Sequence, residues 1–141
     1  MLRQGAKRGV TRKPRDDPEH RNQVWLFQWV AANLRKYPDL ECLYAIPNGG
    51  QRNKAVAAKL KAEGVKSGVS DLHLPVARGG FCGLWIELKI EPNKPTKAQI
   101  QWLESMRAQG HDVDACYGWN ESRQRIEDYL KLPRTKLGET E

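Results

Sequence analysis

The chain has 141 residues, of which 24 are Lys or Arg and 17 are Asp or Glu, so its formal net charge is +7. This length fits one compact domain and is too short for two ordinary ones, and the positive charge favours an anionic partner, nucleic acid before membrane. No apolar run approaches the roughly 20 residues of a bilayer span and no signal peptide is visible, so we expect no membrane association and a cytoplasmic location.

The first fifteen residues are basic and lack apolar periodicity. They contain six Lys or Arg and no acidic residue, which is typical of a flexible arm that follows nucleic acid, although a solvated tail would have the same composition. We therefore expect a basic arm over 1–15, one domain over 16–132 and a flexible C-terminal tail over 133–141.

The first half of the domain predicts a helix, a strand and a second helix. Helical spacing runs from Asp17 to Lys36, with Pro18 well placed in the first turn. Five residues would lie on one face of this helix: Gln23, Phe27, Val30, Ala31 and Leu34. A short alternating strand is expected over 41–46, and a turn then leads to a basic helix over 53–63 that ends at Gly64.

The second half alternates between strands and helices. The expected elements are strands over 71–77 and 84–90, a helix over 97–108, a strand over 112–117 and a helix over 121–131 capped by Asn120. The three cysteines and three histidines are scattered, without the spacing of a zinc motif or a disulfide framework, so we expect the cysteines to be packed thiols.

The expected strand over 84–90 reads LWIELKI and places two charges in an apolar run. Alternation puts the aliphatic residues on one face and Trp85, Glu87 and Lys89 on the other. An acid beside an amine is costly in a core unless something pairs or coordinates it. The second face therefore suits a metal ion held next to a group that handles protons.

A hairpin centred near Gly79 would pair Leu72 with Ile86 and Leu74 with Leu84, and would set Asp71 opposite Glu87. Opposed residues have Cβ atoms about 4.5–5.5 Å apart, so the two carboxylates would repel without a cation between them. Mg²⁺ suits such oxygen ligands, and Lys89 could activate water or neutralise charge on a phosphodiester. On spacing alone, an aspartate in a turn and a solvated strand face would account for these residues equally well.

Several motifs together resemble a known nuclease family. They are IPNGGQRNK at 46–54, EGVKSG at 63–68, GVSDL at 68–72, IELK at 86–89 and TKAQIQWLESMRAQGHDV at 96–113. In this order they resemble the virus-type replication-repair nuclease (VRR-NUC) domain, a branch of the PD-(D/E)xK nucleases. The resemblance runs from about Glu19 to about Leu130 and is closest to small members from phages or prophages.

The resemblance implies an α/β fold with an αβββαβ core, in which a central mixed sheet is flanked by helices. It implies Mg²⁺ or Mn²⁺ as cofactor, bound by Asp71, Glu87 and the backbone carbonyl of Leu88. It also assigns Lys89 as the catalytic lysine, and Gln99 and Glu19 as further active-site residues. Ser70 stands where the family usually has proline, and because that proline only shapes the turn, we expect activity to survive the change.

Two of these residues have simpler interpretations. Thr96 and Gln99 are spaced as a capping box, in which Gln99 would only close the start of its helix. An acid such as Glu19 in a first turn is favoured by the helix dipole alone. The resemblance also implies that a turn-rich loop binds DNA, with Asn48, Gly49, Gly50, Arg52 and Lys54 as the binding residues. An ordinary turn would have much the same sequence.

The sequence therefore predicts a divalent-metal-dependent DNA endonuclease. Resemblance to the small phage-type members suggests a homodimer acting on branched DNA, such as four-way junctions or flaps, inside a bacterial host cell. The alternatives are a DNA-binding module that has lost its chemistry, which the joint presence of Asp71, Glu87, Lys89 and Gln99 argues against, and a nuclease without structure selectivity. A sequence-specific restriction-type enzyme would need base-reading insertions for which the chain has little room.

Overall fold

The computed structural model describes residues 16–47 and 53–138. The predicted basic arm over 1–15 and four residues of the predicted DNA-binding loop, Asn48, Gly49, Gly50 and Arg52, lie outside these ranges. The described elements are α1 (Pro18–Asn33), the 3₁₀-helix η1 (Pro38–Cys42), β1 (Tyr44–Ala45), α2 (Lys54–Ala62), β2 (Leu72–Leu74), β3 (Leu84–Lys89), α3 (Lys97–Ala108), β4 (Asp112–Tyr117) and α4 (Gly118–Leu130). None of these helices combines the length and the apolar character that crossing a membrane would require.

The strands form one mixed sheet in the order β1-β2-β3-β4. β2 is antiparallel to both β1 and β3, and β4 is parallel to β3 after the α3 crossover. Leu72 pairs with Ile86 and Leu74 pairs with Leu84, so the register predicted from alternation is confirmed. The predicted α/β fold with a central mixed sheet is confirmed as well.

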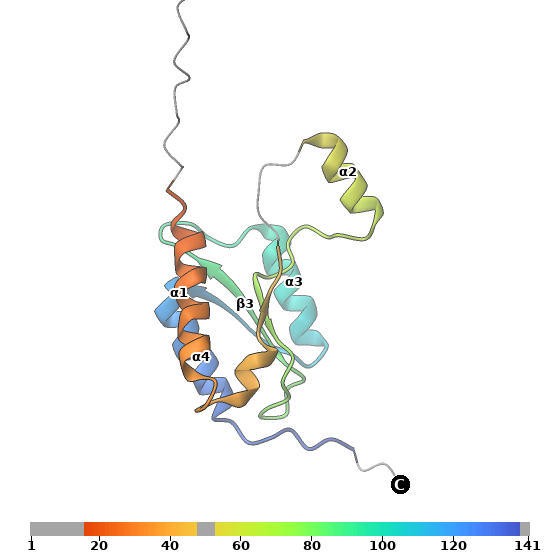
Figure 1. Cartoon of the computed structure of the whole chain (residues 1–141). Coiled ribbons are helices and arrows are strands. Elements are labelled where there is room, and N and C mark those ends of the chain that lie inside the picture. The colour runs from red at the N-terminus through yellow and green to blue at the C-terminus, as the bar shows by residue number, and fades with distance from the viewer. Residues whose placement is uncertain (1–15, 48–52, 139–141) are drawn as a thin grey trace, which may run out of the picture.

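Helices cover both faces of this sheet (Figure 1): α1 and α4 lie on one face and α3 on the other. The larger core lies under α1 and α4, and includes Leu26, Leu72, Ile86 and Ile126. On the α3 side, Trp85 packs with Leu103 and Val113. All six residues of β3 are therefore buried, including the two charged ones.

Helix α1 begins as predicted, but its buried face only partly matches the predicted one, which shares Val30 and the partly buried Phe27 with it. Asp17 caps it by accepting a hydrogen bond of 3.1 Å from the His20 N–H, and Pro18 occupies the first turn. Its buried residues are Leu26 and Val30, whereas Ala31 and Leu34 of the predicted face are exposed. Because residues 22–34 include no charged side chain, the hydrophobic pattern does not mark one side of the helix as inward.

The strand predicted over 41–46 is mostly wrong. Residues Pro38–Cys42 form the 3₁₀-helix η1 instead, and β1 is limited to Tyr44 and Ala45. Leu40 and Leu43 are both buried, and a spacing of three residues brings them to one side of a 3₁₀ turn. Packing of this pair against the core has outweighed the alternation of apolar and polar residues that predicted a strand.

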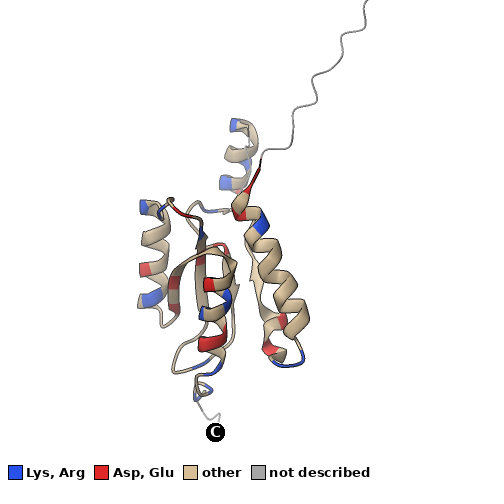
Figure 2. Ribbon diagram, turned by 90° about the vertical axis from the view of Figure 1, so that its left-hand side faces the viewer, with Lys and Arg blue, Asp and Glu red and all other residues tan. Residues whose placement is uncertain are grey.

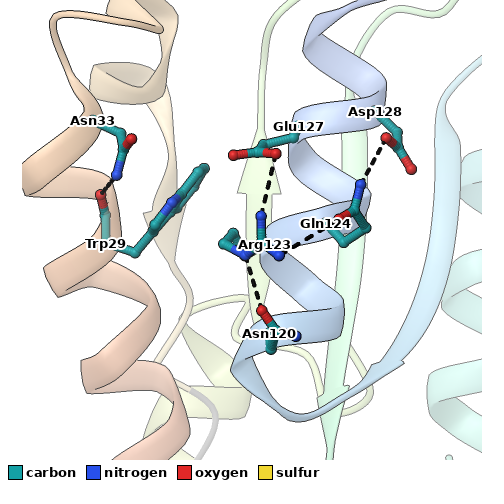
Figure 3. A network of polar contacts seen from close by, with 7 residues as sticks. All are labelled: Trp29, Asn33, Asn120, Arg123, Gln124, Glu127 and Asp128. Carbon is teal, nitrogen blue, oxygen red and sulfur yellow. Dashed lines mark hydrogen bonds and ion pairs between the residues drawn. The ribbon is translucent and has the colours of Figure 1, made fainter.

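Helix α4 begins three residues earlier than predicted, and Asn120 is not its cap. The Asn120 side chain accepts a hydrogen bond from Arg123 within the helix, and the Trp29 indole extends from α1 toward Arg123 (Figure 3). Asn22 of α1 satisfies the start of α4 by accepting a 3.0 Å hydrogen bond from the Trp119 N–H. The capping group therefore comes from a residue distant in sequence, which local spacing does not reveal.

The segment that follows α4 contacts the hairpin turn between β2 and β3. The Gly79 N–H donates to the Pro133 carbonyl at 2.6 Å. The Thr135 hydroxyl donates to the Phe81 carbonyl at 2.8 Å and accepts from the Gly80 N–H at 3.1 Å. These contacts join residues 133–135 to the folded part of the chain.

Candidate active site

The candidate site lies where β3 extends beyond β2. The last β2 pairing joins Leu72 to Ile86, whereas β3 continues to Lys89 with β4 along its other edge. Asp71 immediately precedes β2, and its carboxylate accepts a 2.8 Å hydrogen bond from the Leu88 N–H. A side-chain carboxylate thus takes the place of a backbone acceptor at the open edge of β3.

Glu87 and Lys89 lie next to this edge on the α3-facing side of the strand, with only 1% and 8% of their surface exposed. The Lys89 Nζ is 3.6 Å from the Glu87 Oε1, which is an ion pair but too long for a good hydrogen bond. The other oxygen, Glu87 Oε2, is buried and has no hydrogen-bond partner among the described residues. Buried carboxyl oxygens are normally satisfied, so this one points to a missing ligand.

The ionisation of the two carboxyl groups is coupled. Burial, followed by the neighbouring charge of Asp71, raises the pKa of Glu87 to about 8. Burial also raises the pKa of Asp71, against the opposing effects of the Leu88 N–H and the Glu87 carboxyl group. The negative charge of Asp71 thus disfavours ionisation of Glu87, and a cation beside the pair would favour it.

This donor set fits a hard divalent cation. A cation would offset the repulsion between the two carboxylates and satisfy the unpartnered Glu87 oxygen, and carboxylate ligands suit Mg²⁺ or Mn²⁺. Within the described ranges, no three His, Cys, Asp or Glu side chains are arranged to hold a metal ion. Two carboxylates would therefore need to be supplemented by backbone, water or substrate oxygens, which is common for Mg²⁺.

Glu19 belongs to the same electrostatic environment. It is partly buried in the first turn of α1. Burial raises its pKa, the nearby charge of Asp71 raises it further, and that of Lys89 lowers it. The fold thus brings the start of α1 to the end of β3, so four of the predicted residues, Glu19, Asp71, Glu87 and Lys89, lie in one neighbourhood.

Among the described residues, no hydrogen bond or ion pair joins Gln99 or Lys54 to this group. Gln99 closes the start of α3 as a capping box: its Oε1 accepts from the Thr96 N–H at 2.8 Å, and its own N–H donates to the Thr96 hydroxyl at 3.3 Å. Its amide nitrogen makes no hydrogen bond with any described residue, and Gln99 also lines a groove beside α2. Lys54 is exposed at the start of α2.

Sequence reasoning named the Leu88 carbonyl but missed the Leu88 N–H, which holds Asp71 in place. The signal that could have revealed it is the difference in strand length, because an unpaired N–H at a buried strand edge needs an acceptor. The end of β2 was itself predicted too late, at 77 instead of Leu74.

Comparison with known proteins agrees with this geometry. The family model of the VRR-NUC domain matches residues 17–120. A solved structure named "VRR_NUC domain protein" superposes with a TM-score of 0.72 at 26% sequence identity, covering 88% of this chain and 100% of that chain. A search of curated proteins finds no match. Because the family model spans most of the chain, including Asp71, Glu87 and Lys89, the protein belongs to the VRR-NUC domain family, a family of nucleases.

Proposed function

We propose that this protein is a divalent-metal-dependent DNA endonuclease whose metal ligands are Asp71, Glu87 and the backbone carbonyl of Leu88. The observation that carries the proposal is the arrangement of two carboxyl groups at the end of β3: Asp71 is held by the Leu88 N–H, and buried Glu87 has one oxygen without a hydrogen-bond partner among the described residues. The Leu88 N–H faces Asp71, and in an antiparallel pair the N–H and C=O of one residue point the same way. This supports the Leu88 carbonyl as a third oxygen ligand.

The residues around the pair suit phosphodiester hydrolysis. Bound Mg²⁺ or Mn²⁺ would act as a Lewis acid on the phosphodiester group. Lys89, held beside Glu87, carries a positive charge that can stabilise the negative charge developing on phosphate oxygens, and its amine can hand over or accept a proton. Glu19 can orient the attacking water, and the free amide N–H groups of Gln99 can donate to a neighbouring phosphate.

The proposed substrate is branched DNA, such as a four-way junction or a flap, in the cytoplasm of a bacterial host. The net charge of +7 supports a polyanionic substrate. One Asp71–Glu87 centre cuts one strand, whereas a four-way junction needs two cuts. A two-fold dimer would supply a second centre in matched geometry.

The outer surface of α1 supports a homodimer. Val24 and Trp25 are 41% and 44% exposed, and Leu34 is exposed at the end of the helix. Trp25 also lines an apolar hollow with Gln28, Trp29 and Trp119. Below its first turn α1 carries no charge (Figure 2), and an uncharged apolar surface of this kind is typical of subunit contacts.

The experiment that tests the activity uses end-labelled junction, flap, duplex and single-stranded DNA under one salt condition. We expect cleavage in Mg²⁺ or Mn²⁺, none in excess chelator, and faster cleavage of junction or flap than of plain duplex. Cleavage in chelator would contradict the metal site. Equal rates on all duplex-containing substrates would leave a nuclease without structure selectivity, and binding without cleavage in either metal would indicate an inactive DNA-binding module.

A further inference from the structure

Helix α2 has an unusual position in the fold. None of its residues is buried, and Figure 1 shows it standing apart from the sheet and from the other helices. It is nine residues long and is capped by Asn53, whose side chain accepts from the Val56 N–H at 2.8 Å. Helices shorter than about 12 residues are marginal unless they pack against something, so α2 lacks a packing partner within the described chain.

A groove lies between α2 and the rest of the domain. It has a volume of about 750 Å³ and is open to solvent. One wall comes from α2, and the other from the loop after it and the start of α3. The residues that matter here are Ala57, Leu60, Lys61, Lys66, Val69 and Gln99.

The groove combines cationic and apolar side chains. Lys61 and Lys66 are exposed, and neither forms an ion pair with any residue that the structure describes. Over residues 53–70 the chain carries four lysines and a single acid, Glu63. The charge is therefore complementary to a polyanion, while Ala57 and Leu60 add apolar side chains to the lining of the groove.

The groove is close in sequence to the candidate active site. Two of the residues that line it, at 68 and 69, are followed by Ser70 and Asp71. Gly68 lies so close to α3 that a Cβ on it would be 2.8 Å from the Ala98 backbone. This close approach holds the loop that precedes Asp71 against α3.

We propose that this groove holds one single-stranded segment of the DNA substrate, with Lys61 and Lys66 contacting its phosphates. The inference rests on the proposed function, because it takes DNA as the substrate. Sites that bind single strands follow the phosphate backbone with a positively charged groove, and a flap offers such a strand whereas a duplex does not. The bound strand supplies the packing partner that α2 lacks.

The first test measures binding of a fluorescent oligothymidine by anisotropy in chelator, so that no cleavage interferes. The Lys61→Gln/Lys66→Gln variant loses two positive charges, and so does the control Lys36→Gln/Lys131→Gln, whose lysines lie beyond the far ends of α1 and α4. We expect at least tenfold weaker binding for the groove variant only. The slope of log K against log salt should flatten by about 1.4, for two phosphate contacts on a single strand.

Equal losses in both variants would show that only overall charge matters, and no loss in the groove variant would overturn the proposal directly. Circular dichroism checks that both variants fold. The proposed function is tested separately by Glu87 variants: if they lose cleavage while the groove variant binds normally, the nuclease assignment stands and the groove assignment fails.

A second test places a photocrosslinker on α2. The expectation that the cysteines are packed thiols is confirmed for Cys116 and wrong for Cys42 and Cys82, which are exposed. Cys42→Ser/Cys82→Ser therefore gives a background in which a new cysteine can be labelled selectively. Ala57→Cys lies in the groove, whereas Ala62→Cys is also exposed on the same helix but does not line it. We expect single-stranded DNA to crosslink to position 57 and not to 62, and equal crosslinking would contradict the groove.

Discussion

Glu87 links the stability of the metal-free protein to pH. The pKa of Glu87 is about 8 in the folded state, against an ordinary value of 4.5. Between these two pH values the folded chain therefore holds a proton that the unfolded chain has lost. A group of this kind contributes stability that is fully present below pH 4.5 and is lost as the pH rises toward 8. We predict that Glu87→Gln, which removes the titration, is more stable than the wild type at pH 8 by about 2 kcal/mol.

Thermal unfolding in chelator at several pH values between 5 and 8.5 measures this effect. The wild type should lose stability across the range, and Glu87→Gln should lose less. Glu91→Gln is the control, because Glu91 is exposed two positions beyond the end of β3. Parallel pH profiles for the wild type and Glu87→Gln would show that Glu87 ionises normally.

Ser70 is a second residue whose environment predicts a measurable effect. It is fully buried, and its hydroxyl has no hydrogen-bond partner within the described chain. A buried hydroxyl without a partner costs free energy, so we predict that Ser70→Ala raises the free energy of unfolding by about 1 kcal/mol. Urea denaturation measures the change, with Ser67→Ala at an exposed position as the control. Destabilisation by Ser70→Ala would imply a hydrogen bond to an ordered water.

At the scale of elements, the contact between the loop after α2 and helix α3 can be isolated with two glycines. Gly64 and Gly68 both have positive φ, at +93° and +84°, but only Gly68 lies close to other atoms, since nothing is within 4 Å of a Cβ on Gly64. Alanine should strain both positions. We predict that Gly68→Ala costs about 1–3 kcal/mol more than Gly64→Ala, because it also forces the loop away from Ala98.

Chemical denaturation of the two variants gives that difference directly. Gly68→Ala should in addition slow DNA cleavage, because the loop that it displaces ends at Asp71. Equal destabilisation by the two substitutions would mean that the loop and α3 can separate without cost.

Elements with strong local signals could be predicted from the sequence. Helix α3 and strand β4 have the predicted bounds, because a capping box at Thr96 and a turn at Gly110 mark their limits. The pairing of Leu72 with Ile86 followed from alternation and a glycine turn. The nearness of Asp71 and Glu87 in the candidate site was predicted for the same reason, since it follows from this register.

What could not be predicted depends on contacts between distant segments. One example is Asn22, which caps the start of α4, and another is the burial of Leu26 on α1. Both depend on how α1 and α4 pack, and a local sequence pattern does not contain that information. The groove beside α2 was missed for the same reason. Lys66 was visible within the EGVKSG motif, but its relation to Lys61 and Gln99 appears only in three dimensions.

At the scale of the whole molecule, the proposed homodimer predicts that a charge on α1 separates the subunits. Trp25→Glu would bury a carboxylate in the interface, which is costly without a partner. We expect the wild type to sediment as a dimer at micromolar concentration and Trp25→Glu as a monomer with an unchanged fold. Leu137→Glu, at an apolar residue 77% exposed beyond α4, should leave the dimer intact. A monomeric wild type, with and without DNA, would contradict the proposal.

The central claim is that the Asp71–Glu87 pair is the metal-binding centre of a nuclease. The most direct measurement is the single-turnover rate of cleavage of a labelled four-way junction in Mg²⁺ by the wild type and by Glu87→Gln, which keeps the shape of the side chain but not its charge. We predict that the variant binds the junction as tightly as the wild type and cleaves it more than about 100-fold more slowly, since loss of even an outer partner of a metal ligand costs up to roughly that factor. Cleavage by Glu87→Gln at the wild-type rate would contradict the account.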